Sequence, residues 1–248
     1  MANETATYEC GVCGAPIDKK NDSTAMPLPC SNCGKVARNY FATMGNAQPS
    51  NYLLDRYIAH KLSELTECGA DELPDEPNWL NTFILKSIFE INLQPKPKAY
   101  LFNFLRRTEG ASAAYREARL MLQEHIKTPR NVVSPYFKSL THFEICIAQC
   151  YQGYELLASA TGQKLYIDGS DSSEERLQKV YVDSKHMDRM IHGEKLPVTA
   201  TSGIWITNFG IESSRGAISF EELHGLLRQM HILAEKLCAA DPNPPAAQ

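Results

Sequence analysis

The chain has 248 residues, a formal net charge of −4 and 43% hydrophobic residues, values that are ordinary for a globular protein with one sizeable core or two smaller ones. The negative balance argues against a protein that coats nucleic acid through bulk charge. The N-terminus MANETATYEC lacks the pattern of a signal peptide, and no apolar run is long enough to span a bilayer. We therefore expect a cytoplasmic protein that does not enter a membrane.

Two CxxC pairs lie in residues 1–46: CGVCG, with Cys10 and Cys13, and CSNCG, with Cys30 and Cys33. Each CxxC turn brings two thiolates toward one ion, and two such turns complete the tetrahedral shell that Zn²⁺ prefers. A redox dithiol is the alternative, but its usual setting at a helix start in a βαβ pattern is absent. Residues 8–41 resemble the zinc-ribbon family. Four thiolates leave no position for water, so we expect a structural Zn²⁺.

The sequence defines the metal site of this ribbon more closely than the partner that the ribbon binds. Residues 1–46 carry four acidic and four basic side chains, which is not the charge balance of a phosphate-binding module. Tyr40 and Phe41 either stack on bases or on a protein partner, or cover the ribbon against the rest of the chain. Both interpretations remain open.

From residue 47 the sequence contains amphipathic stretches with apolar residues three and four positions apart. This spacing predicts helices over 51–65, 78–93 and 111–127. The stretch LQPKPKAY reads as a break before the third helix. A fourth helix begins with Ser134 as N-cap and Pro135. Its continuous apolar stripe predicts burial against other helices: Tyr136, Leu140, Phe143, Ile147, Cys150, Tyr154 and Leu157.

A fifth helix follows the polar loop DGSDSS, and GIWITNFGIES then predicts one short β-hairpin near 204–212. The last helix starts with a capping box of Ser219 and Glu222. The expected fold is thus mainly α. It comprises a zinc ribbon over 1–46, a helical bundle over 47–240 and a disordered tail over 241–248.

The stretch SKHMDRMIH in the fifth helix groups basic and titratable side chains. Leu177, Val180, Ser184, Met187 and Ile191 would form its inward stripe. Lys185, Arg189 and His192 then fall on another face, which His186 borders. A solvated helix face is one interpretation. The other is anion or RNA binding with a histidine as general acid or base.

A helical bundle with YVDSKHMDRMIH late in the chain resembles HEPN-type proteins over roughly residues 110–240. This resemblance implies a dimer that cleaves RNA without metal, through an arginine that is usually followed by a polar residue and, after four to six positions, a histidine. Arg119 and His125 have this spacing, although Leu120 follows the arginine. Arg189 and His192 are closer together than the signature requires.

Two functions are therefore expected. The first is an interaction module that binds a protein partner, or RNA as the alternative, in a prokaryotic defence or regulatory assembly. The second is a metal-independent endoribonuclease that uses Arg119 and His125, or His186, Arg189 and His192. The first needs no catalytic centre, and whether the chain is an enzyme is left open. A homodimer is compatible with both.

Overall fold

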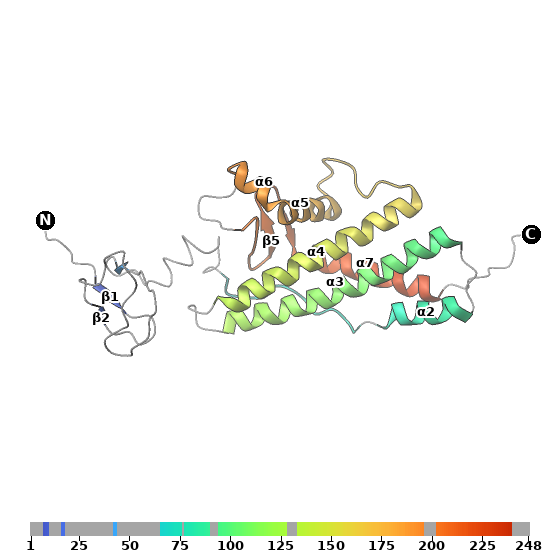
Figure 1. Ribbon diagram of the computed structural model, residues 1–248, viewed down its shortest axis with the longest axis horizontal. Helices are drawn as coiled ribbons and strands as arrows, with labels where there is room; N and C mark the ends of the chain where they lie inside the picture. The colour runs from blue at the N-terminus through green and yellow to red at the C-terminus, as the bar shows by residue number, and fades with distance from the viewer. Residues whose placement is uncertain are drawn as a thin grey trace, which may run out of the picture.

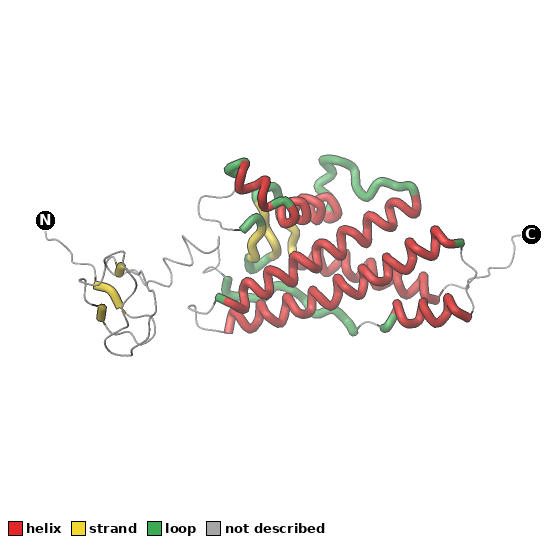
Figure 2. Tube along the Cα trace, in the orientation of Figure 1, coloured by secondary structure: helices red, strands yellow, loops and turns green. Residues whose placement is uncertain are grey.

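The computed structural model describes residues 65–75, 77–89, 94–127, 133–195 and 202–239, together with the backbone of three short strands nearer the N-terminus (Figures 1 and 2). Helices make up most of these residues, so the prediction of a mainly α fold is confirmed. The four predicted zinc cysteines, residues 51–64 of the helix expected over 51–65, and the expected disordered tail over 241–248 lie outside the described residues.

The three short strands are β1 (Thr7–Glu9), β2 (Pro16–Ile17) and β3 (Ala42–Thr43). They form an antiparallel sheet in the order β2-β1-β3. Tyr8 pairs with Ile17 on one side and with Ala42 on the other. Strands β1 and β2 are therefore neighbours both in the sheet and in the sequence.

Two long helices, α3 (Pro95–Lys127) and α4 (Ser134–Thr161), run side by side and form the backbone of the bundle (Figure 1). Five residues of the predicted α4 stripe are buried, and Tyr154 and Leu157 pack half-buried against the same core. The stripe prediction is confirmed. The helix begins at Ser134 itself, so the expected cap lies one residue further along the chain than the observed one, Val133.

Helix α3 begins about four turns earlier than the sequence suggested. Pro95 and Pro97 lie in its first turn, where backbone N–H groups have no partner within the helix, so the missing donors cost little. The helix then continues to Lys127 without interruption. The proline-rich stretch is therefore the start of α3 and not a break before it.

Helix α2 (Trp79–Phe89) and helix α7 (Phe220–Ala239) pack against α3 (Figure 1). The Ser219–Glu222 capping box is confirmed. The Ser219 N–H donates to Glu222 Oε2 at 2.9 Å, and the Glu222 N–H donates to Ser219 Oγ at 3.1 Å. This cap fixes the start of α7, whose Leu223, Leu226 and Leu227 are buried.

A second antiparallel sheet, in the order β4-β5-β6, lies beside α5 (Ser173–Lys185). Strands β4 (Ile204–Ile206) and β5 (Gly210–Ser213) are the predicted hairpin, and β6 (Ala217–Ser219) is a third strand that the sequence did not suggest. The Ile206 N–H donates to the hydroxyl of Tyr136 at 3.0 Å, which ties β4 to α4. Among the described helices, none has the length and hydropathy to cross a membrane.

Candidate functional site: the strap groove

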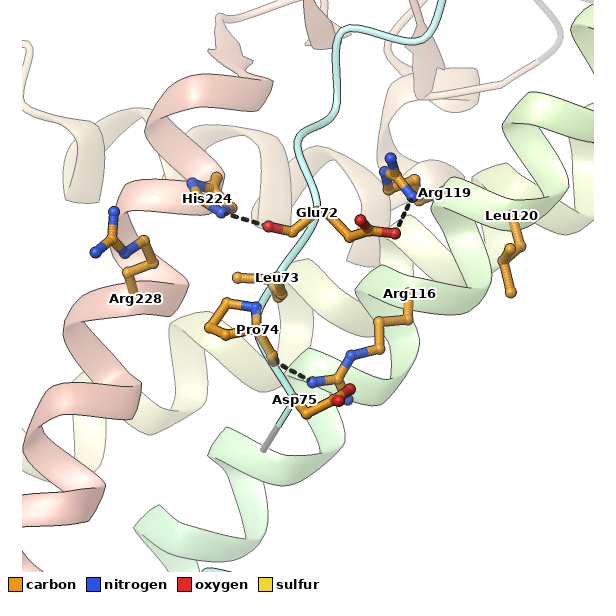
Figure 3. A pocket seen from close by; sticks show the side chains of 9 residues that line it. All are labelled: Glu72, Leu73, Pro74, Asp75, Arg116, Arg119, Leu120, His224 and Arg228. Atoms are coloured by element: carbon orange, nitrogen blue, oxygen red, sulfur yellow. Dashed lines mark hydrogen bonds and ion pairs between the residues drawn. The ribbon is translucent and has the colours of Figure 1, made fainter. Parts of the chain in front are cut away.

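Residues 65–75 have no regular secondary structure and pass between α3 and α7 (Figure 3); we call this segment the strap. Three of its side chains are buried: Leu65, Ala70 and Leu73. Near its start, the N–H groups of Thr66 and Glu67 both donate to Asn208 Oδ1, at 2.9 and 3.1 Å. The strap is thus a packed part of the bundle, although its acidic side chains are exposed: Glu67, Asp71, Glu72 and Asp75.

Side chains of α3 and α7 hold the strap by its carbonyl oxygens. The four contacts are Tyr115 to Asp71 (2.9 Å), Arg116 to Pro74 (2.7 Å), Arg119 to Ala70 (2.9 Å) and His224 Nε2 to Glu72 (3.2 Å). Removing a carbonyl from water without a hydrogen bond costs free energy. These contacts therefore stabilise a segment that has no regular secondary structure to pair its backbone groups. They also fix the positions of two arginines and a histidine.

An open groove of about 800 Å³ runs along the strap (Figure 3). Its charged and titratable lining comes from three elements: Arg116 and Arg119 on α3, His224 and Arg228 on α7, and Glu72 and Asp75 on the strap. Leu73 and the half-exposed Leu120 supply apolar surface. With three arginines against two carboxylates, the groove has a local positive excess in a chain of net negative charge.

Arg119 shows what this groove can recognise. Its Nε donates to the strap backbone, while Nη1 lies 3.2 Å from Glu72 Oε1. The Arg119 side chain is 21% exposed and that of Glu72 is 82% exposed, so the guanidinium is fixed and the carboxylate is free to leave. Exposed ion pairs contribute little stability. A carboxylate from another molecule is therefore able to replace Glu72 at small cost.

The structure separates Arg119 from His125, its predicted partner. His125 is 8% exposed and packs edge-to-face against Tyr136, with ring centroids 5.5 Å apart. It does not line the groove that Arg119 faces. The two residues lie on the same helix but on different sides of it, so they do not meet at a common reacting atom.

The other predicted cluster lies away from the groove. Helix α5 ends at Lys185, and α6 (Met187–His192) starts after a break at His186, whose φ and ψ are −114° and 42°. Arg189 and His192 are exposed and His186 is half-buried. The expected inward stripe is wrong beyond the break: Ile191 is 57% exposed, and Met190 is buried instead.

The described cysteines offer no second metal site. Cys146 and Cys150 are buried in the α4 stripe, and burial raises the pKa of both thiols. Within the described residues, no group of three or more His, Cys, Asp or Glu side chains is arranged to hold a metal ion. These thiols therefore behave as small apolar core groups.

Sequence reasoning missed most of the groove. Arg116 precedes Arg119 by three residues, and His224 precedes Arg228 by four, spacings that place each pair on one helix face. These spacings were visible in the sequence, but the proximity of α3 to α7 was not. No family model, curated protein or solved structure matches this chain.

Proposed function

We propose that the chain is an intracellular, non-catalytic protein-interaction module. A structural zinc ribbon forms its N-terminal part, and the helical bundle binds a carboxylate-bearing segment of a partner protein. The observation that carries the proposal is the Arg119–Glu72 pair, in which an immobilised guanidinium already holds an exposed carboxylate. A partner's Asp or Glu side chain would take the place of Glu72, with Arg228 exposed on the other side of the strap.

The proposal of a zinc ribbon rests on the spacing of four cysteines and on the position of three short strands beside them. Strands β1 and β2 pair on either side of the segment that contains Cys10 and Cys13, and β3 follows Cys33. Short antiparallel strands that flank a CxxC pair agree with the arrangement of a zinc ribbon. The ion would be held by the four cysteine thiolates and would stabilise the fold of this region.

The alternative, a HEPN-type endoribonuclease, has less support. General acid–base catalysis needs a group within hydrogen-bonding reach of the reacting proton. His125 is buried against Tyr136, and neither His186, Arg189 nor His192 lines the groove that contains Arg119. The net charge of −4 also disfavours RNA as the main partner.

The proposal is tested with two fluorescent probes of the purified full chain: a peptide of alternating Glu and Pro, which stays extended, and a single-stranded RNA of twelve nucleotides. We expect the peptide to bind with a salt-sensitive affinity that falls at least about tenfold in Arg119→Gln/Arg228→Gln, the loss of one or two charge-assisted contacts. Arg189→Gln removes an exposed arginine outside the groove and serves as the matched control.

Peptide binding that is equal in Arg119→Gln/Arg228→Gln and in Arg189→Gln would overturn the groove as the site. Preferential binding of the RNA would redirect the proposal to nucleic acid. Cleavage of the RNA in EDTA by the wild-type chain, lost in a folded His125→Ala or His192→Ala variant, would establish the nuclease in place of the interaction module.

A further inference from the structure

Within the described residues, helix α2 is attached to the bundle by the face that carries Trp79 and Phe83. Trp79 and Phe83 are each 2% exposed and lie in the core. The N–H of Leu80 donates to Glu109 on α3 at 2.8 Å, and the Lys86 ammonium donates to the carbonyl of Cys238 on α7. These contacts fix the helix at its start and near its end. The orientation of its outer face relative to the bundle is therefore fixed.

The C-terminal half of that outer face carries three exposed apolar side chains. Ile84, Leu85 and Ile88 are 37%, 57% and 65% exposed, and their spacing places them side by side on the helix. An isolated exposed aliphatic side chain is ordinary, but three adjacent ones on a fixed helix form a patch. Removing the exposed parts of these side chains from water favours binding in proportion to the apolar area that is covered. The patch is thus a substantial source of binding energy.

A groove continues the patch toward α3. It has a volume of about 470 Å³ and lies between α2 and the first turns of α3. Phe83 and Phe102 contribute aromatic surface, and Ile84 belongs both to the groove and to the exposed patch. Lys98 lines the same groove. Apolar groove and apolar helix face together form one surface, which we call the α2 face.

The described residues of α2 and of the first turns of α3 carry charge of one sign only. Among the described residues 77–89 and 94–103, there are three lysines, Lys86, Lys96 and Lys98, and no Asp or Glu. The whole chain has more acidic than basic residues, 29 against 25, so this stretch differs from the average surface. Two copies of such a surface would bring lysines toward lysines, which disfavours pairing of the α2 face with itself.

We propose that the α2 face docks an amphipathic helix of a partner protein that carries Asp or Glu beside its apolar stripe. The apolar side chains of such a helix would cover Ile84, Leu85 and Ile88, with one anchor in the groove between α2 and α3. Its carboxylates would meet Lys96 and Lys98. This surface shares no residue with the strap groove, so the inference is independent of the function proposed above.

The probe for this surface is a fluorescein-labelled 18-residue helix with a leucine stripe flanked by glutamates, and a matched peptide has lysines in place of the glutamates. We expect the acidic peptide to bind the full chain and the basic one to bind at least tenfold more weakly. Leu85→Glu/Ile88→Glu should weaken binding of the acidic peptide at least tenfold. The control is Ile191→Glu, which places the same charge on an exposed isoleucine of α6.

Three results would overturn the inference: equal binding of both peptides, an effect of Ile191→Glu as large as that of Leu85→Glu/Ile88→Glu, or unchanged binding in that double variant. Sedimentation velocity adds a further check. A wild-type dimer that becomes a monomer in Leu85→Glu/Ile88→Glu would show that a second copy occupies the α2 face. Because the mutated leucine and isoleucine are exposed, both variants should keep the wild-type circular dichroism spectrum.

Discussion

Ser112 Oγ lies 2.6 Å from His231 Nε2, in the buried contact between α3 and α7. The serine hydroxyl also lies 2.9 Å from the carbonyl of Thr108, to which it donates. Its oxygen is then the acceptor for a proton on Nε2, which corresponds to a neutral imidazole with hydrogen on that nitrogen. Burial lowers the pKa of His231 to about 4, with smaller contributions from the positive charge of Arg116 and from His224.

This pair predicts a pH-dependent stability. The unfolded chain binds a proton at His231 near pH 6.5, whereas the folded chain binds it only near pH 4. The free energy of unfolding should therefore be constant above about pH 6.5 with respect to this group and fall as the pH drops toward 4, by at most about 3 kcal/mol. Urea unfolding of the wild type at pH 7, 5.5 and 4 measures this fall.

His231→Gln is the matched variant, because the glutamine amide nitrogen takes a position similar to Nε2 and still donates to Ser112 without titrating. The carboxylates of the protein titrate equally in both chains, so the difference between the two pH profiles isolates the histidine. Identical slopes between pH 6.5 and 4 would show that the pKa of His231 is the same in the folded and the unfolded chain.

A second prediction concerns Asp183 and Arg215. The Asp183 side chain is 3% exposed, with one oxygen paired to Arg215 Nε and the other, Oδ2, buried without a hydrogen bond. Arg215→Ala should lower the free energy of unfolding by about 2–3 kcal/mol, because it leaves a buried carboxylate without its cation. Asp183→Asn in the same background should restore part of this loss. Glu72→Gln, which removes the exposed partner of Arg119, should change stability by less than about 0.5 kcal/mol.

Two glycines provide a third, paired prediction. A Cβ at Gly210 in β5 would overlap the carbonyl oxygen of Ile218 and lie 2.7 Å from Ser219 Cα, both backbone atoms of the neighbouring strand. Gly210→Ala should therefore cost about 2 kcal/mol or more. At Gly225 in α7 a Cβ meets nothing within 4 Å, so Gly225→Ala should stabilise the protein by about 0.5–1 kcal/mol. Thermal unfolding that ranks the two variants in the opposite order would contradict the strand pairing of β5 with β6.

The fourth prediction is one zinc ion per chain. Atomic-emission analysis of the dialysed protein should give a zinc-to-protein ratio near one, and Cys10→Ser/Cys30→Ser should reduce it toward zero. Cys68→Ser changes a half-buried cysteine of the strap and should retain the metal. A wild-type chain without zinc, or a double variant that keeps it, would refute the zinc ribbon.

Local patterns predicted local structure well. The apolar stripe of α4 and the Ser219–Glu222 capping box were readable because each depends on residues within one or two helical turns. The start of α3 at Pro95 was not, because prolines end helices in the interior but are tolerated in the first turn. The break at His186 could not be predicted from the apolar pattern either, because the pattern continues through it to Ile191.

The strap groove depended on long-range contacts. The sequence singles out Arg119 as a catalytic candidate because of its spacing from His125. In the structure its contacts are with Ala70 and Glu72, far earlier in the chain. A scattered apolar residue such as Leu73 within an acidic stretch hints at burial, but it does not reveal that α3 and α7 lie on either side. Only the packed fold combines the arginines of two helices.

The order in which the chain is synthesised gives the strap a further consequence. The Thr66 N–H donates to Asn208, which is translated 142 residues later. The Glu72 carbonyl pairs with His224, which is translated 152 residues later. At about 5–20 residues per second, the ribosome needs about 7–30 s to cover such an interval. During that time the strap lacks its contact with α7, and Leu65 and Leu73 lack part of the core that later buries them. The strap, which precedes α3 and α7 in the chain, thus completes its contacts only after α7 has been made.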